Sequence, residues 1–224
     1  MLNRMTPVVK NLVIINVLVF LAQGAMPGLE PIFMGHYPLG MNFQPWQVVT
    51  HMFMHGSLSH IFFNMFALVV FGSALERVWG SKRFLQYYLL CGIGAFFFYE
   101  FTIGIDLYCN GFIAELRDGR IVLLQEAGSF VSQYDINKVL GASGCVYGLL
   151  LGFGMLFPNT ELMLLFPPIP IKAKYFVIIY GLIELSLAIG NNPGDNVAHV
   201  AHLGGMLFGY ILIKKWQKSR TNFY

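Results

Sequence analysis

Three apolar stretches of the chain carry polar residues that are able to perform acyl-transfer chemistry. Ser143 lies in the glycine-rich run VLGASGCVYGLLLGFGMLF, residues 139–157. His60 and Asn64 lie in HMFMHGSLSHIFFNMF, and His202 lies in NVAHVAHLGGMLFG. Polar side chains inside apolar spans usually face the protein interior or a water-filled cavity. These residues are therefore candidates for one shared pocket.

A serine hydroxyl becomes an effective nucleophile when a base removes its proton, and histidine is the usual base. The sequence therefore predicts that Ser143 is the nucleophile and His202 the general base. Asn64, His60 and the Ser143 backbone amide are the donors available for the oxyanion of a tetrahedral intermediate. The spans near Ser143 and His202 offer no aspartate to orient the base, which favours a Ser–His dyad.

Glycines at helical spacing predict how two of these stretches meet. Gly144, Gly148 and Gly152 recur every four residues after Ser143, and Gly205 and Gly209 do so after His202. Small residues at this spacing let two helix backbones approach closely in a membrane. Close approach of these two helices is what a direct serine–histidine contact needs. Taken alone, however, a serine in a glycine-rich span is typical of a packing residue.

The composition indicates a membrane protein. The chain has 224 residues, of which 56% are hydrophobic and 11% charged, and its mean hydropathy is +0.62. Soluble domains carry about 25% charged residues. Hydropathy predicts six spans in one membrane domain, residues 1–224. The spans run near 10–26, 48–75, 84–103, 139–157, 173–190 and 197–213.

The predicted fold is an all-α, polytopic bundle of six transmembrane helices with a long external loop between the third and fourth. That insert covers 104–138, and its segment 112–125 contains two alternating runs around Asp118-Gly119. This pattern predicts a β-hairpin, with a surface amphipathic segment as the alternative. The short turn 191–196 is expected to be external, with Asp195 or Asn196 capping the sixth helix.

The distribution of basic residues predicts the orientation. If the N-terminus is cytoplasmic and the spans alternate, eleven of the fourteen Lys and Arg residues lie on the cytoplasmic side. Basic residues concentrate on that side of membrane proteins. We therefore expect a multi-pass protein of the inner cell membrane with both termini cytoplasmic. The basic residues lie at membrane edges and form no continuous patch, so no nucleic-acid partner is expected.

Four motifs together resemble the rhomboid family of intramembrane serine proteases, in its bacterial six-span form. They are Gly141-Ala142-Ser143-Gly144, Ala201-His202-Leu203-Gly204-Gly205, the set His51, His55, His60 and Asn64-Met65, and Glu76-Arg77-Val78-Trp79-Gly80. The resemblance implies cleavage of membrane-protein substrates in or near their transmembrane segments, without metal or cofactor. It implies that Ser143 and His202 form the dyad and that His60 and Asn64 form the oxyanion hole. His51, His55 and Tyr147 would be supporting polar residues of the active site.

Two departures from the family pattern concern the external rim. The first loop has Trp46-Gln47 where many members have Trp-Arg, and the 104–138 insert is long. Neither involves the dyad.

Two other functions are compatible with parts of the sequence. One is a catalytically inactive rhomboid-like scaffold, although both Ser143 and His202 are present. The other is a histidine-box metalloenzyme, because the pairs His51/His55 and His199/His202 have the spacing of metal ligands. His199 is otherwise expected to face water at the rim, and Glu184 is a polar residue in a span without an assigned function.

Overall fold

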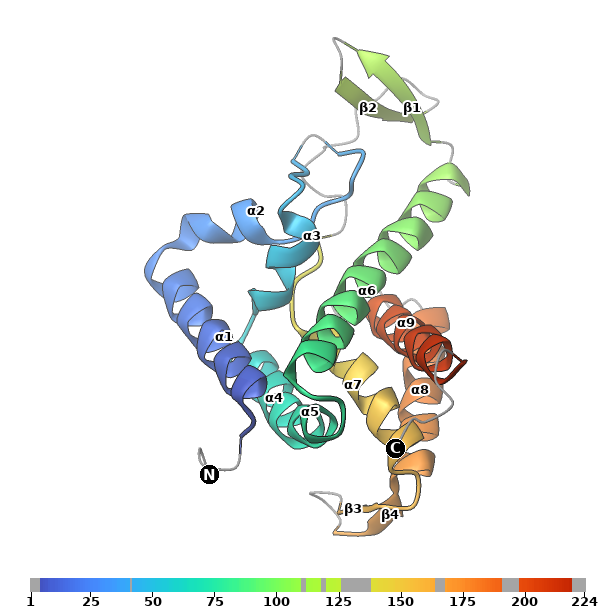
Figure 1. The fold of residues 1–224 in the computed structure, drawn as a ribbon. Coiled ribbons are helices and arrows are strands. Elements are labelled where there is room, and N and C mark those ends of the chain that lie inside the picture. Colours follow the sequence, from blue (N-terminus) through green and yellow to red (C-terminus); the bar gives the residue numbers. More distant parts are fainter. Residues whose placement is uncertain are drawn as a thin grey trace.

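The computed structural model describes residues 5–40, 42–109, 112–117, 120–125, 138–163, 168–190 and 198–218. It confirms a mostly helical membrane fold (Figure 1). The long helical segments are α1 (Pro7–Ala25), α4 with α5 (Leu58–Ala67 and Ser73–Trp79), α6 (Ser81–Cys109), α7 (Ser143–Leu156), α8 (Ala173–Gly190) and α9 (His199–Lys218).

Four of these helical segments are long and apolar enough to cross a membrane. They are Pro7–Ala25, Leu58–Trp79, Ser81–Cys109 and Ala173–Gly190. α7 is a shorter apolar helix, and α9 is less apolar because histidines and lysines occupy its two ends. With these two central helices, the observed order matches the six predicted spans.

The predicted second span, 48–75, is not one continuous helix. Residues Gln47–Thr50 form the short helix α3, which continues as a 3-10 turn over His51–Phe53. The chain is then extended at Met54, and α4 begins only at Leu58. Ser57 caps α4, since its side chain accepts a hydrogen bond of 3.1 Å from the His60 amide. His51 and His55 therefore do not share a helix face.

A π-helical segment, Leu68–Gly72, joins α4 to α5. A π-segment accommodates an extra residue in a turn and changes the direction in which later side chains point. Here it separates Asn64, on the site side, from Glu76 on α5.

Glu76 anchors the start of α1. Its carboxylate accepts hydrogen bonds from the Val8 and Val9 amides, each of 3.0 Å, and from the hydroxyl of Thr6. It also accepts one of 2.7 Å from Ser81 Oγ. The first amides of a helix have no partner within the helix, so Glu76 acts as a cap supplied by another span.

Two hairpins lie at opposite ends of the molecule (Figure 1). β1 (Phe112–Arg117) pairs antiparallel with β2 (Arg120–Gln125), which confirms the predicted hairpin over the alternative of a surface amphipathic segment. The expected turn residues, Asp118 and Gly119, lie outside the described residues. β3 (Glu161–Met163) pairs antiparallel with β4 (Pro170–Lys172) in the connection between α7 and α8.

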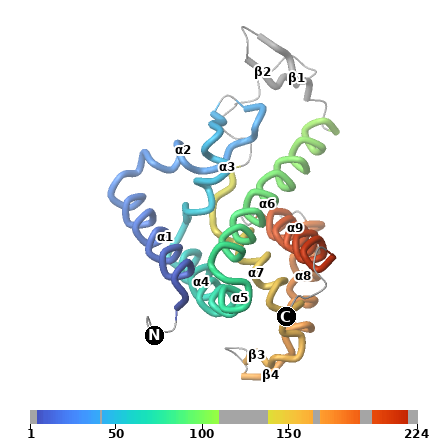
Figure 2. Tube along the Cα trace, viewed as in Figure 1, coloured from blue at the N-terminus to red at the C-terminus, as the bar shows by residue number. Residues whose placement is uncertain are grey.

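α6, α7 and α9 pack together at the centre of the bundle (Figure 2). The predicted glycine contact between α7 and α9 is present. A Cβ on Gly205 would overlap the carbonyl oxygen of Gly144, and one on Gly209 would lie 3.4 Å from Gly148 Cα. The absence of side chains at these positions is what lets the two backbones touch.

The first loop is tied to the segment before α7. It contains a 3-10 turn, Pro27–Leu29, and the short helix α2 (Glu30–Phe33). Gly35 and Val139 exchange two backbone hydrogen bonds of 2.8 and 3.0 Å. Trp46 Nε1 donates to the Ile32 carbonyl at 3.0 Å. The loop thus holds the residues that lead into Ser143.

Candidate active site

Ser143 is the first residue of α7. Gly141, two residues earlier, has a φ of 123°, a conformation that residues with a Cβ rarely adopt. The Gly141 amide donates to the His51 carbonyl at 2.8 Å, which fixes the approach to the helix. Because Ser143 opens the helix, its own amide is among the first N–H groups, which have no intrahelical acceptor. That amide is therefore available to an oxyanion.

His60 lies directly over the turn that precedes Ser143. A Cβ placed on Gly141 would be 2.7 Å from His60 Nε2 and 3.7 Å from Ser143 Oγ. The imidazole and the hydroxyl thus border the same small space, which Gly141 leaves open. The His60 ring also meets the His55 ring edge-on, with centroids 5.1 Å apart.

Asn64, one turn after His60 on α4, is buried with 6% of its surface exposed. Its Nδ2 has no hydrogen-bond partner among the described residues. A buried amide donor without an acceptor is costly, and such a group in a native fold needs an explanation. A site that must receive a negatively charged oxygen provides one.

His202 on α9 is held by an aromatic contact to its ring face and by a polar contact to its Nδ1 atom. Its ring stacks on that of Tyr147 from α7, with centroids 4.2 Å apart and an angle of 10° between the planes. Its Nδ1 lies 2.8 Å from Glu184 Oε2 on α8. The side chain is buried, with 7% of the residue exposed.

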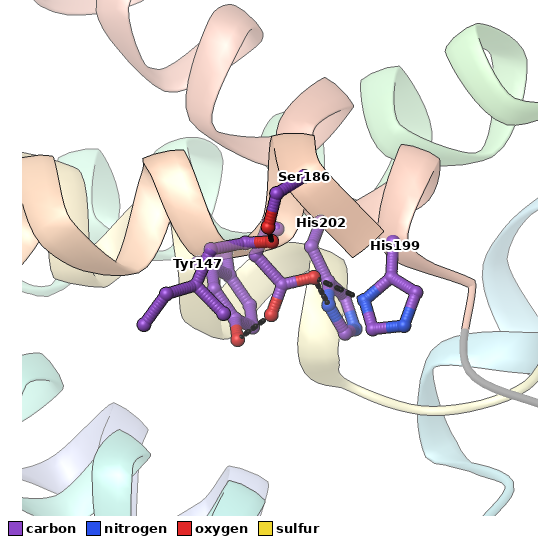
Figure 3. Close-up of polar contacts among 6 residues, drawn as sticks. Tyr147, Ser186, His199 and His202 are labelled. Atoms are coloured by element: carbon purple, nitrogen blue, oxygen red, sulfur yellow. Dashed lines mark hydrogen bonds and ion pairs between the residues drawn. The ribbon is translucent and has the colours of Figure 1, made fainter. Parts of the chain in front are cut away.

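Glu184 is the centre of a polar cluster that the sequence did not predict. Figure 3 shows its partners Tyr147, His199 and His202 lying close together. Besides His202, its Oε2 meets His199 Nδ1 at 2.6 Å, and its Oε1 accepts a hydrogen bond from the Tyr147 hydroxyl. The expectation that His199 faces water is wrong: only 10% of its side chain is exposed, because it lies against this carboxylate.

The spans that carry Ser143 and His202 contain no aspartate that could orient the base, and a glutamate from another span takes this position. Glu184 lies in a different span, 18 residues before His202. The feature of the sequence that marks Glu184 as a candidate functional residue is a carboxylate inside an apolar helix.

Direct contact between the two dyad candidates is not formed in this state. Among the described residues, Ser143 Oγ and His202 share no hydrogen bond. Catalytic hydrogen bonds are often long before substrate binds. The packing nevertheless places them on neighbouring helices, since a Cβ on Gly144 would lie 3.8 Å from the Ala201 carbonyl oxygen.

His51 and His55 bond backbone carbonyls. His51 Nδ1 lies 2.8 Å from the Gln47 carbonyl, and His55 Nδ1 lies 3.3 Å from that of Phe53. The backbone of His55 is also held by the Gln23 side chain of α1, through bonds of 3.0 and 3.3 Å. These contacts support the segment between the first loop and α4.

Within the described residues, Glu184, His199 and His202 have ligand-type atoms close enough together to be considered as a metal site. Two ligands of one tetrahedral zinc ion lie about 3.4 Å apart. The observed separations between Oε2 and the two Nδ1 atoms, 2.6 and 2.8 Å, are instead those of N–H···O hydrogen bonds. The proposed ligand pair His51/His55 is engaged with carbonyls, as described above.

The fold and these polar residues define the class of protein. It is a multi-pass membrane protein with serine, histidine and asparagine side chains on the helices α4, α7 and α9. Comparison with known proteins then gives the family. A family model described as the Rhomboid domain matches residues 42–217, which is most of the chain. The protein belongs to the rhomboid family.

Individual relatives agree with this assignment. The chain is 29% identical to RHOMBOID-like protein 12, mitochondrial, of Arabidopsis thaliana over 177 residues, which cover 79% of this chain and 48% of that protein. It is 27% identical to RHOMBOID-like protein 6, mitochondrial, of the same plant over 187 residues, covering 80% and 48%. It is also 27% identical to Rhomboid protease AarA of Providencia stuartii over 190 residues, covering 79% and 57%. The chain spans about half the length of the curated relatives it matches.

Proposed function

We propose that the chain is an intramembrane serine endopeptidase that hydrolyses peptide bonds in or near transmembrane segments of membrane proteins. The observation that carries this proposal is the arrangement around α7. Ser143 opens the helix beside His60, and His202 on the adjoining helix has Nδ1 engaged, which leaves Nε2 to act as the base. Membership of the rhomboid family supports the same reaction.

The reaction follows from the roles of these groups. Ser143 Oγ attacks the scissile carbonyl carbon while His202 Nε2 accepts the hydroxyl proton. The oxyanion is stabilised by the Ser143 amide, Asn64 Nδ2 and His60. His202 then donates its proton to the leaving amine, and a water molecule hydrolyses the acyl-enzyme. No metal or cofactor takes part in this scheme.

Substrate is expected to enter laterally from the bilayer, between the second span and α8. α8 has the smallest buried share of the four candidate spans, so fewer contacts hold it in place. The turn at 191–196, expected to act as a lid, lies outside the described residues. We further propose that residues 1–224 act as one membrane domain, placed in the inner cell membrane with both termini in the cytoplasm.

The test is labelling of the detergent-purified protein with a fluorescent fluorophosphonate, together with cleavage of a transmembrane reporter peptide. We expect the parent to label and cleave with or without a metal chelator. Ser143→Ala and His202→Ala should do neither while remaining folded by circular dichroism. A folded parent that does not label would favour an inactive scaffold. Loss of cleavage on chelation would favour a metalloenzyme.

A further inference from the structure

Glu184 is a buried carboxylate that interacts with three donors from two other helices. Oε2 meets Nδ1 of both His199 and His202, and Oε1 meets the hydroxyl of Tyr147. Only 5% of Glu184 is exposed. A buried charge is stable when its lone pairs are filled by hydrogen bonds, and here α7 and α9 supply all three donors to α8.

The contact with Glu184 fixes the chemistry of His202. An ionised carboxylate has acceptors only, so the ring atom facing it, Nδ1, must carry the proton. In a neutral imidazole the other nitrogen, Nε2, then carries the lone pair. This is the tautomer that a general base needs when Nε2 is the atom directed at the serine. The same carboxylate stabilises the imidazolium that forms after proton transfer.

Tyr147 completes the restraint on the ring. Its own ring lies nearly parallel to that of His202, and its hydroxyl is bonded to the other oxygen of Glu184 (Figure 3). Tyr147 thus fixes the plane of the imidazole, while the Glu184 carboxylate fixes how the ring is turned within that plane. A carboxylate serving only to join helices would not require this alignment with the base.

We infer that Glu184 is a positioning residue for His202, so that the site operates as a Ser143–His202–Glu184 arrangement. This inference rests on the proposed function and extends it beyond a dyad. Glu184 touches no substrate and acts through His202 alone. His199 shares the carboxylate and helps to hold it in place.

The kinetic test compares Glu184→Gln with Glu100→Gln in cleavage of the transmembrane reporter. Glutamine keeps the size of the side chain but removes the charge and can present an N–H to Nδ1, which would select the wrong tautomer. We expect kcat to fall at least about 100-fold, with KM changed less than about threefold. Glu100 is the matched control, because it is a buried carboxylate in α6, 4% exposed, with no hydrogen-bond partner among the described residues. Its kcat should stay within about twofold of the parent.

A second measurement reads the tautomer without any turnover. In ¹⁵N-histidine-labelled Ser143→Ala protein, the ring nitrogen shifts of His202 should show a protonated Nδ1 and an unprotonated Nε2. The signals are assigned by their loss in a Ser143→Ala, His202→Gln protein. Adding Glu184→Gln should shift the population towards the Nε2–H form.

Two results would overturn the inference while leaving the proposed function in place. One is a Glu184→Gln protein whose kcat stays within about threefold of a parent that labels with fluorophosphonate. The other is an Nε2–H tautomer of His202 in the protein that retains Glu184, and this result does not depend on how well the Glu184 variant folds. A parent that neither labels nor cleaves would instead overturn the proposed function, and with it any catalytic meaning of the contact.

Discussion

At the scale of single residues, Asn64 offers the sharpest test of the oxyanion hole. Its Nδ2 is buried and has no acceptor among the described residues. If this amide donates a hydrogen bond to the oxyanion, Asn64→Ala should lower kcat for the reporter peptide by about 10²–10³-fold, the usual effect of losing one such donor. Reporter cleavage at saturating substrate measures this directly.

The matched control for Asn64 is Asn16→Ala on α1. Asn16 is also a buried amide, but its Nδ2 already donates to the Leu12 carbonyl at 2.7 Å. Its loss should reduce thermal stability and leave kcat within about twofold of the parent. If Asn64→Ala cleaves as fast as Asn16→Ala, Asn64 has no part in stabilising the transition state.

The residues of the site differ in how far the sequence alone could predict them. Ser143, His60, Asn64 and His202 are identified from the sequence because each is a polar group in an apolar run and because together they supply a nucleophile, a base and oxyanion donors. Glu184 carries the same local signal, yet its partnership with His202 depends on how α8 is rotated against α9. That rotation is set by packing between helices, which no short stretch of sequence encodes.

At the scale of elements, the α7–α9 contact is what brings the two dyad candidates to neighbouring positions. The glycine spacing predicted this contact correctly, because close helix packing requires small residues on both faces. The break between the 3-10 turn and α4 was not predicted, because the hydrophobic run through Met52 and Met54 indicates a continuous span over 48–75. Both methionines are buried, but Met52 lies in the 3-10 turn and Met54 is the extended residue that follows it.

Gly205→Ala should separate the two central helices. Its new Cβ would overlap the backbone carbonyl of Gly144, which cannot move aside as a flexible side chain can. Overpacking of this kind costs about 1–3 kcal/mol, and a displacement of about 1 Å at a catalytic group can cost about 100-fold in rate. We therefore expect a lower melting temperature together with a large loss of kcat, measured by thermal unfolding in detergent and by reporter cleavage.

Gly24→Ala provides the comparison for Gly205→Ala. Gly24 lies in α1, and a Cβ there would meet nothing within 4 Å. This change should be neutral, or stabilising by up to about 1 kcal/mol through helix propensity. Equal activity and stability of the two alanine variants would show that α7 and α9 do not depend on this contact.

At the scale of the whole molecule, contacts between distant segments place three points of the chain at one end of the bundle. The start of α1 is bonded to Glu76 on α5. Near the C-terminal end of α9, the Trp216 ring lies 5.8 Å from that of Trp79 and 5.0 Å from the Arg83 guanidinium. The β1–β2 hairpin and the far end of α6 lie at the opposite end (Figure 1). Successive spans that alternate in direction between these two ends place most of the lysine and arginine residues on one side of the membrane.

The natural cysteines can decide which side is cytoplasmic. Cys91 and Cys145 are buried, whereas Cys109 is exposed at the end of α6. If the termini are cytoplasmic, Cys109 faces the opposite compartment. A membrane-impermeant maleimide added to the external face of sealed cells should then label the protein, and Cys109→Ala should abolish the signal. On the same premise, Lys218→Cys in the Cys109→Ala protein should label only after the membrane is opened, because position 218 is the last residue of α9, close to the C-terminus. The reverse pattern, with Lys218→Cys labelled in sealed cells and Cys109 protected, would invert the topology and place the mouth of the Ser143 site towards the cytoplasm.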